Sequence, residues 1–173
     1  MIEYYTEALV LGKEDVNEAD GLVYFYTKDL GKVIGKAKGV RKMTSKLNAH
    51  LEPLNFVNVR LVSGKNHYFQ IADALSFKTD LTKKIKKSPQ ILSKFLGIVD
   101  FIKEATFELQ PDFNLWQTIN KMVSSDIKEI SAFRLILKEL GFDPEFAECG
   151  LCRNKNIVYF LKKDQIFLCE KCG

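Results

Sequence analysis

Four cysteines near the end of the chain are the residues whose type and spacing point most directly to chemistry. Cys149 and Cys152 form one C-x₂-C pair, and Cys169 and Cys172 form a second pair after sixteen intervening residues. Two thiolates three positions apart can bind one side of an ion, and two such pairs complete a tetrahedral Cys₄ shell, which Zn²⁺ accepts readily. The sequence therefore predicts a zinc site with the ligands Cys149, Cys152, Cys169 and Cys172.

The predicted zinc is structural, because four thiolate ligands leave no open coordination position for water. A segment of about 25 residues also cannot bury enough surface to fold alone, so metal binding supplies its folding energy. Two disulfides, a redox pair and an iron–sulfur cluster are the alternatives for the same cysteines. The start of the chain has no signal sequence and no stretch is long enough for a membrane span, so we expect a cytoplasmic protein with reduced cysteines.

Other residues give little support to catalysis. His50 and Glu52 match the H-x-E of zinc nucleobase deaminases, but neither cysteine pair follows a proline, and two cysteines would be left without a role. His67 is the only other histidine, and no G-x-x-x-x-G-K-[ST] loop is present, so histidine triads and ATP hydrolysis are disfavoured. We predict a protein that is not an enzyme, with no catalytic residues. The acidic residues of one turn are interpreted as exposed rather than as a magnesium site: Glu14, Asp15, Glu18 and Asp20.

Positive charge is concentrated in one stretch. The formal net charge is +4, yet the 23 residues from Lys28 to His50 hold seven basic residues and one acid, which leaves −2 for the rest of the chain. Such clustering favours a nucleic-acid partner. A solvated strand face without a ligand is the alternative. The residues predicted to contact phosphates are Lys32, Lys36, Lys38, Arg41, Lys42 and Lys46.

Aromatic residues accompany this basic stretch. We expect most of them to lie in a core and some to stack on bases. The candidates are Tyr24, Tyr26, Phe56, Tyr68 and Phe69.

The elements that hold these residues begin with strands. Hydrophobic alternation with period two predicts strands at residues 4–11, 21–27, 32–38, 55–61 and 68–77. Five short strands with basic and aromatic content suit a closed OB-fold barrel, which leaves no exposed sheet edge. In the third strand the alternation puts Lys32, Lys36 and Lys38 on one face with Ile34. The small or branched residues of the other face enter the barrel: Val33, Gly35 and Ala37.

A helical period follows from about residue 81 to residue 140. Ser88 is expected to cap a helix with Pro89 at its first position, and that helix is expected to end at Gln110 before Pro111. A second helix carries Leu115, Trp116, Ile119 and Val123. A third is predicted to begin at Asp126, with Glu129 completing a capping box, and to end at Gly141. Residues 157–161 and 166–168 then suggest a two-stranded hairpin.

The predicted fold class is α+β and multidomain. It comprises an N-terminal OB-fold barrel (1–80), a central α-helical bundle (81–146) and a C-terminal Cys₄ zinc module (147–173).

Several short motifs occur in a characteristic order. They are T-E-A-L-V-L at 6–11, N-E-A-D at 17–20, T-K-D-L-G-K at 27–32, A-K-G-V-R-K-M-T-S at 37–45, L-E-P at 51–53, and L-G-F-D-P at 140–144 before the first cysteine pair. Together they resemble the RecO family of bacterial recombination mediators over nearly the whole chain. Family members usually continue with further helix after the zinc module, whereas this sequence ends at Gly173.

The resemblance implies a function in DNA repair and homologous recombination. RecO-like proteins bind single- and double-stranded DNA, anneal complementary strands and, with RecR, help RecA to displace single-stranded DNA-binding protein (SSB). They work in the bacterial cytoplasm at the nucleoid, without a membrane partner. Family DNA binding by basic OB-domain residues carries over to the six predicted phosphate contacts. The alternative function is an RNA- or ribosome-associated OB-fold and zinc-finger protein.

Overall fold

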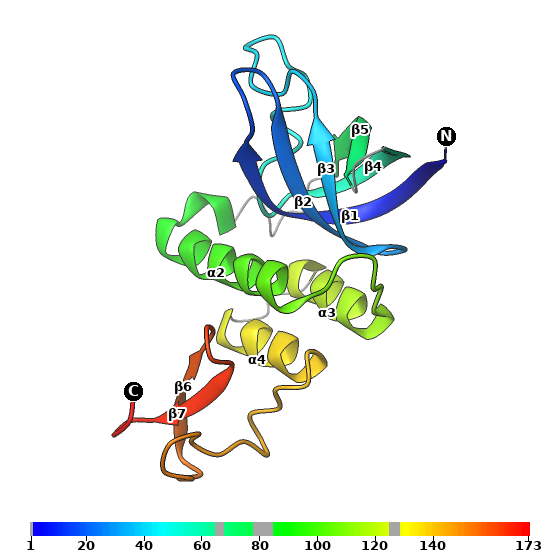
Figure 1. The fold of residues 1–173 in the computed structure, drawn as a ribbon. Coiled ribbons are helices and arrows are strands. Elements are labelled where there is room, and N and C mark those ends of the chain that lie inside the picture. Colours follow the sequence, from blue (N-terminus) through cyan, green and yellow to red (C-terminus); the bar gives the residue numbers. More distant parts are fainter. Residues whose placement is uncertain (1, 65–67, 78–84, 125–128) are drawn as a thin grey trace.

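The computed structural model describes residues 2–64, 68–77, 85–124 and 129–173. Its layers follow the order of the chain (Figure 1). A β-barrel forms one end, helices pack beneath it, and a small hairpin with the C-terminus forms the opposite end. Within these residues, no helix is long and apolar enough to cross a membrane.

The barrel contains five strands and is closed in the order β1-β2-β3-β5-β4, with β4 returning to β1. The β3–β5 pair is parallel and the other neighbours are antiparallel. The prediction of a closed OB-fold barrel is therefore confirmed. The strands are β1 (Glu3–Asp15), β2 (Gly21–Thr27), β3 (Gly31–Ala37), β4 (Phe56–Ser63) and β5 (Phe69–Ser76).

Barrel closure depends on a glycine in β3. The parallel contact between β3 and β5 is short and pairs Gly35 with Phe69. Gly35 faces the interior, where an added Cβ would lie 2.7 Å from Ile71 Cγ1 and 3.2 Å from Phe25 Cε2. The predicted alternation of β3 is confirmed, and its central glycine is needed for close packing of the barrel interior.

The β2–β3 turn joins the barrel to the helices. The Thr27 hydroxyl accepts a hydrogen bond from the Leu30 N–H and donates one to the Gly31 carbonyl, both at 3.0 Å. Gly31 has a φ of +68°, and a side chain there would overlap the Gln110 carbonyl. Only glycine satisfies both conditions without strain.

The helices are α2 (Pro89–Ala105), α3 (Phe113–Ser124) and α4 (Glu129–Glu139). Pro89 begins α2 as predicted, but the Ser88 side chain makes no capping hydrogen bond. The predicted end at Gln110 was wrong, because α2 ends five residues earlier. There, Thr106 is extended, and its hydroxyl donates to the Ile102 carbonyl at 2.6 Å. The residues after Thr106 therefore leave the helix and lie beside β3, where the Leu109 N–H donates to the Lys32 carbonyl at 2.9 Å.

The ends of the other helices follow familiar capping patterns. The Asp112 carboxylate accepts a hydrogen bond from the Leu115 N–H at 3.0 Å and so caps α3. Gly141 has a φ of +88°, and the Phe142 N–H donates to the Leu137 carbonyl at 2.8 Å, so the prediction that Gly141 terminates α4 is confirmed. The predicted start of α4 at Asp126 lies outside the described residues.

Two apolar clusters stabilise these layers. One fills the barrel interior, and the other lies between the barrel and the helices, where Leu9, Tyr26 and Phe56 meet Ile102 and Trp116. The barrel and helices therefore bury a shared core. The proposed divisions near residues 80 and 146 stay a prediction.

The C-terminal hairpin consists of β6 (Ile157–Leu161) and β7 (Ile166–Cys169), so the predicted two-stranded middle is confirmed. Phe160 packs its ring 5.5 Å from that of Phe101, 5.3 Å from that of Phe142 and 4.9 Å from that of Phe167. This aromatic contact fixes the hairpin to the helices.

Candidate metal centre and nucleic-acid interface

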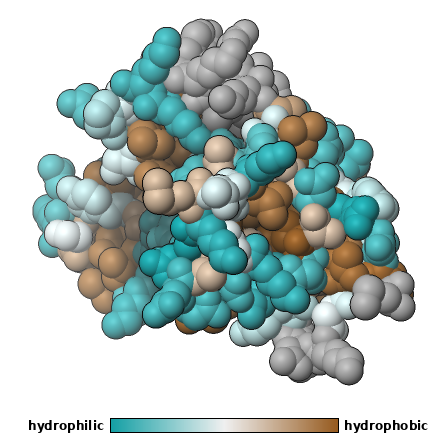
Figure 2. All heavy atoms as spheres, turned by 90° about the horizontal axis from the view of Figure 1, so that it is seen from above, coloured by the Kyte–Doolittle hydropathy of each residue, from teal (hydrophilic) through white to brown (hydrophobic). Residues whose placement is uncertain are grey.

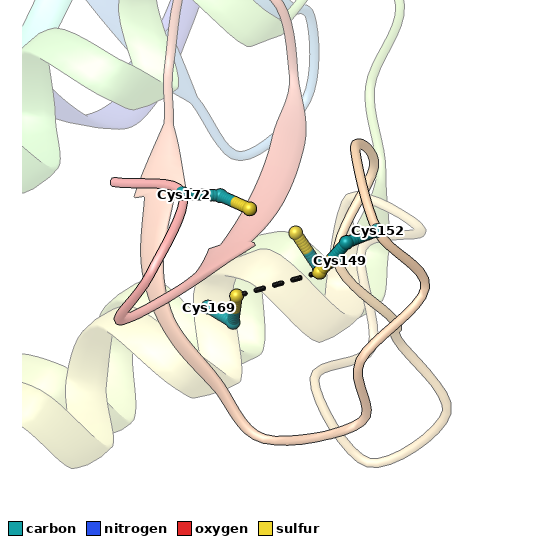
Figure 3. A group of neighbouring side chains, drawn as sticks. All are labelled: Cys149, Cys152, Cys169 and Cys172. Carbon is teal, nitrogen blue, oxygen red and sulfur yellow. Dashed lines mark hydrogen bonds between the residues drawn. The ribbon is translucent and has the colours of Figure 1, made fainter.

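The structure gathers the four cysteines into one cluster (Figure 3). Their Sγ atoms all lie within 4.8 Å of one another, and none of them is in a disulfide. The Sγ atoms of Cys152 and Cys169 are 3.6 Å apart. Tetrahedral zinc with Zn–S bonds of about 2.3 Å sets sulfur–sulfur distances of about 3.8 Å. The donor set and its size therefore fit a zinc ion.

The chain holds the cluster with backbone hydrogen bonds. The Cys149 N–H donates to the Asn154 carbonyl at 2.9 Å, and the Arg153 N–H donates back to the Cys149 carbonyl at 2.8 Å. Gly150 allows the first cysteine pair to approach the hairpin closely. Its N–H donates to the Phe167 carbonyl at 2.9 Å, and an added Cβ would approach Ile166 at 3.2 Å. The first cysteine pair therefore lies directly against β7.

The thiols differ in acidity. Backbone N–H groups of Cys169, Cys152 and Leu151 point at the Cys149 sulfur and lower the pKa of this thiol to about 6. The neighbouring thiols of Cys152 and Cys169 raise the pKa of Cys172 to about 12. One thiolate is thus stabilised by the protein, whereas further thiolates repel it unless a cation neutralises them.

The other polar groups considered for chemistry have structural partners. The His50 Nδ1 accepts the Ser76 N–H at 3.1 Å and lies 2.9 Å from its hydroxyl. His50 thus contacts the end of β5 and is not among the metal-ligating side chains that cluster around Cys149, so it does not join Cys149 in a deaminase-like site. Within the described ranges, no second group of three or more metal-ligating side chains is found.

The acidic turn residues lie beside cations rather than converging on one point. Glu14 pairs with Lys103 at 3.1 Å. Asp15 pairs with Arg41 at 3.2 Å, and Glu18 is exposed. These three acids are exposed as predicted, whereas Asp20 is half-buried against Lys36. The arrangement gives no support to a magnesium site.

Three of the six predicted DNA-binding residues extend freely into solvent. Lys38, Lys42 and Lys46 are exposed, at the end of β3 and in the long connection to β4. None has an acidic partner within 4 Å in the part of the chain that the structure describes. This connection lies at the barrel end of the molecule (Figure 1), and the view from above shows hydrophilic and hydrophobic residues side by side (Figure 2).

Two further predicted residues are held by acids of the β1–β2 turn. The Lys36 Nζ lies 3.1 Å from the Asp20 carboxylate, and Arg41 donates to the Asn17 carbonyl as well as to Asp15. The Gly39 N–H, followed by Lys36 and Asn17, lowers the Asp20 pKa to about 2. These contacts fix the base of the basic loop, the segment 38–46 that follows β3 and carries the exposed lysines.

Lys32 has a different environment from the other five. Its Nζ donates to the Lys103 carbonyl at 2.8 Å, near the C-terminus of α2, where a cation stabilises unpaired carbonyls. Burial lowers the pKa of Lys32. Lys103 itself lies 4.3 Å from the centre of the Tyr24 ring. Sequence reasoning missed Lys103, because its contacts arise only when α2 packs on the barrel.

The five aromatic candidates for base stacking differ in how exposed their rings are. Tyr26 and Phe56 are buried between the barrel and the helices. Phe69 packs inside the barrel against Tyr4, with ring centres 5.7 Å apart. Tyr24 is half-buried beneath Lys103, which leaves Tyr68 as the exposed member of the five.

The fold and the cysteine cluster define an OB-barrel protein with a helical layer and a four-cysteine metal-binding module. The family model for "Recombination protein O N terminal" matches residues 1–77. The DNA repair protein RecO of Clostridium perfringens is 30% identical over 171 residues, which cover 95% of this chain and 70% of that relative. The chain therefore belongs to the RecO family of DNA repair proteins.

Other relatives match over the same extent. RecO of Thermodesulfovibrio yellowstonii is 25% identical over 179 residues, which cover 99% of this chain and 71% of that protein. RecO of Dehalococcoides mccartyi is 27% identical over 184 residues, which cover 98% of this chain and 70% of that protein. The matches include the helices and the cysteine module as well as the barrel.

Proposed function

We propose that this protein is a recombination mediator that binds single- and double-stranded DNA and anneals complementary strands. With RecR, it assists RecA in loading on DNA coated with SSB. The observation that carries the proposal is the group of exposed lysines on the barrel, Lys38, Lys42 and Lys46, in a chain of the RecO family. The same proposal includes a cytoplasmic, nucleoid-associated location in bacteria.

Annealing requires no bond-making chemistry from the protein. Lysines that neutralise phosphates release counterions and lower the repulsion between two strands, and base pairing then supplies the free energy and the specificity. Lys38, Lys42 and Lys46 make the first contacts. Lys36 and Arg41 contribute less, because a phosphate must first displace the carboxylates of Asp20 and Asp15. Lys32 is the sixth proposed phosphate contact and lies where the barrel meets α2. Its contribution is also smaller, because its ammonium group already donates to the Lys103 carbonyl.

We also propose that Cys149, Cys152, Cys169 and Cys172 hold one structural Zn²⁺. When bound, the ion neutralises the thiolates and cross-links the two ends of the hairpin. The fit rests on the four converging sulfurs and on the absence of an open ligand position. The metal stabilises the hairpin and takes no part in chemistry on DNA.

Competition between DNA and RNA oligonucleotides of matched sequence tests the proposal against the RNA-binding alternative. We expect DNA binding that is independent of sequence and weakens as salt rises. We also expect the RNA oligonucleotide to compete no better than unlabelled DNA of the same sequence. Tighter binding of RNA would favour a ribosome- or RNA-associated function, and a flat salt response would contradict the phosphate-contact mechanism.

A further inference from the structure

The outer face of β3 and β5 carries an exposed aromatic ring next to the lysine-bearing strand. In the parallel pairing, Gly35 lies opposite Phe69, so the preceding residues Ile34 and Tyr68 are neighbours. Phe69 and Ile71 belong to the barrel interior. Tyr68 directly precedes β5, and continuing the alternation of side chains back from Phe69 puts Tyr68 on the outer face, on the same side as Ile34.

Tyr68 and Ile34 form a small platform that is open to solvent. Tyr68 is 42% exposed, and Ile34 is half-buried beside it. Tyr24 pairs with Ile34 from β2, but its ring lies under the Lys103 ammonium group at 4.3 Å. Tyr24 therefore closes one side of the platform, and the Tyr68 ring remains accessible.

The platform lies on the path of the basic residues. Lys36 shares the outer face of β3, two positions after Ile34, and the exposed Lys38 follows at the end of the strand. A strand whose phosphates follow these lysines brings its bases beside Tyr68. An aromatic ring next to a cationic backbone track is the combination that binds single strands without sequence preference.

A second exposed tyrosine shows why position matters. Tyr5 is 70% exposed on the other side of the barrel, and its hydroxyl donates to Glu3 at 3.1 Å. The hollow beside it is lined by the three carboxylates of Glu7, Asp29 and Asp73 and by two cations. The cations are Lys28 and Arg60, and the Arg60 guanidinium lies 5.9 Å from the centre of the Tyr5 ring. Tyr5 is thus more exposed than Tyr68, but carboxylates outnumber cations around it and Arg60 already covers its ring, so this surface attracts a phosphate backbone less than the lysine-bearing strand does.

We infer that an unpaired nucleobase stacks on Tyr68 at the Ile34 platform and that this contact makes the protein prefer single strands. The inference rests on the proposed DNA-binding function and extends it to the bases. In a duplex the faces of the bases are already stacked, so a duplex contacts the lysines but not this ring.

The test measures dissociation constants for a single strand, a duplex and a single strand with abasic sites, all of equal length and at one salt concentration. Tyr68→Ala is expected to weaken binding of the normal single strand about tenfold and to leave duplex binding unchanged. Tyr68→Phe keeps the ring and should bind like the wild type. Tyr5→Ala is the matched control and should also bind like the wild type.

The abasic strand separates stacking from a structural effect. The wild type should bind it about tenfold more weakly than the normal strand, whereas Tyr68→Ala should bind both strands equally. Equal binding of the normal strand by the wild type and Tyr68→Ala, with salt-sensitive binding retained, would overturn the inference but not the proposed function. A wild type that binds no DNA contradicts the proposed function and this inference together. Thermal melting confirms that each variant is folded.

Discussion

Lys38 and Lys42 differ from Lys36 and Lys32 in what their ammonium groups already contact. Lys36 has an acidic partner at 3.1 Å and Lys32 is bonded to a helix carbonyl, whereas Lys38 and Lys42 are exposed without such a partner among the described residues. A phosphate therefore meets no competing contact at Lys38 or Lys42. At Lys36 it must displace Asp20.

The double variant Lys38→Gln, Lys42→Gln is expected to weaken single-strand binding about tenfold near physiological salt. Its log–log salt slope should become less negative by about 1.4, because each phosphate contact contributes about 0.7. The control is Lys155→Gln, Lys163→Gln, two exposed lysines of the cysteine module. Equal losses for both variants would show that only the overall charge matters.

Asp20 makes the base of the basic loop sensitive to acid. Its folded-state pKa lies near 2, below the ordinary value of 3.8, because of the Gly39 N–H, Lys36 and Asn17. A depressed folded-state pKa stabilises the fold above about pH 4, and this contribution is lost as the pH falls toward 2. We expect Asp20→Asn to be less stable than the wild type at pH 7, with a difference that shrinks over that range. Denaturant melts at pH 7, 4 and 2 measure it, and a pH-independent difference would contradict this role.

At the scale of elements, barrel closure depends on the space that Gly35 leaves empty. Gly35→Val should destabilise the protein by about 1–3 kcal/mol, because the new side chain overlaps Ile71 and Phe25. Gly97→Ala is the control. It lies in α2, where an added Cβ meets nothing closer than 3.8 Å, so this change should be neutral or stabilising by up to about 1 kcal/mol. A Gly35→Val protein as stable as the wild type would show that the interior has room to adjust.

We expect the stability of the hairpin to depend on the proposed zinc ion and on Phe160. Removal of zinc by a chelator should increase amide hydrogen exchange first in β6 and β7 and then in α4, because Phe133 of α4 packs 6.3 Å from Phe160. The barrel should keep its protection. Cys169→Ser should reproduce the effect and make the chelator ineffective. Unchanged exchange in the hairpin after metal removal would contradict the structural role of zinc.

The strands and the cysteine cluster could be predicted from the sequence because both depend on local spacing. Alternation placed every barrel strand, although β1 continues to Asp15, since a bulge near Gly12 lets it follow β2 further. The end of α2 was predicted wrongly because it depends on a tertiary contact. The helix stops at Thr106, and the following residues pair with β3. Lys32 was grouped with the free lysines for a similar reason, since its partner in α2 is 71 residues away in the sequence.

At the scale of the whole molecule, the barrel and helices share one buried cluster, and the hairpin packs against the same cluster through Phe160 and Phe167. The barrel, which carries the proposed DNA-binding surface, therefore contacts the helical layer directly, through the hydrogen bond of Lys32 to Lys103 and the close approach of Gly31 to Gln110. The hairpin β6–β7, beside which the cysteines cluster, lies at the opposite end of the molecule from the barrel (Figure 1). We expect zinc to act on DNA binding only through stability.

The number of phosphate contacts sets the salt dependence of the intact protein. Contacts by Lys38, Lys42 and Lys46 alone predict a log–log slope near −2 for single strands, whereas all six predicted residues give about −4. Because Lys32 is held by α2 and two others by acids, we expect a value nearer −2. Titrations at several salt concentrations measure this slope, and a value at or beyond −4 would show that the paired residues also release to bind DNA.

The most direct test of the central claim is annealing of two complementary oligonucleotides coated with SSB, without ATP, at low and high salt. The account predicts that the wild type accelerates annealing, that the acceleration fades at high salt, and that Lys38→Gln, Lys42→Gln removes most of it. Annealing at the rate of the uncatalysed strands at both salt concentrations would contradict a mediator that works through the basic face of its barrel.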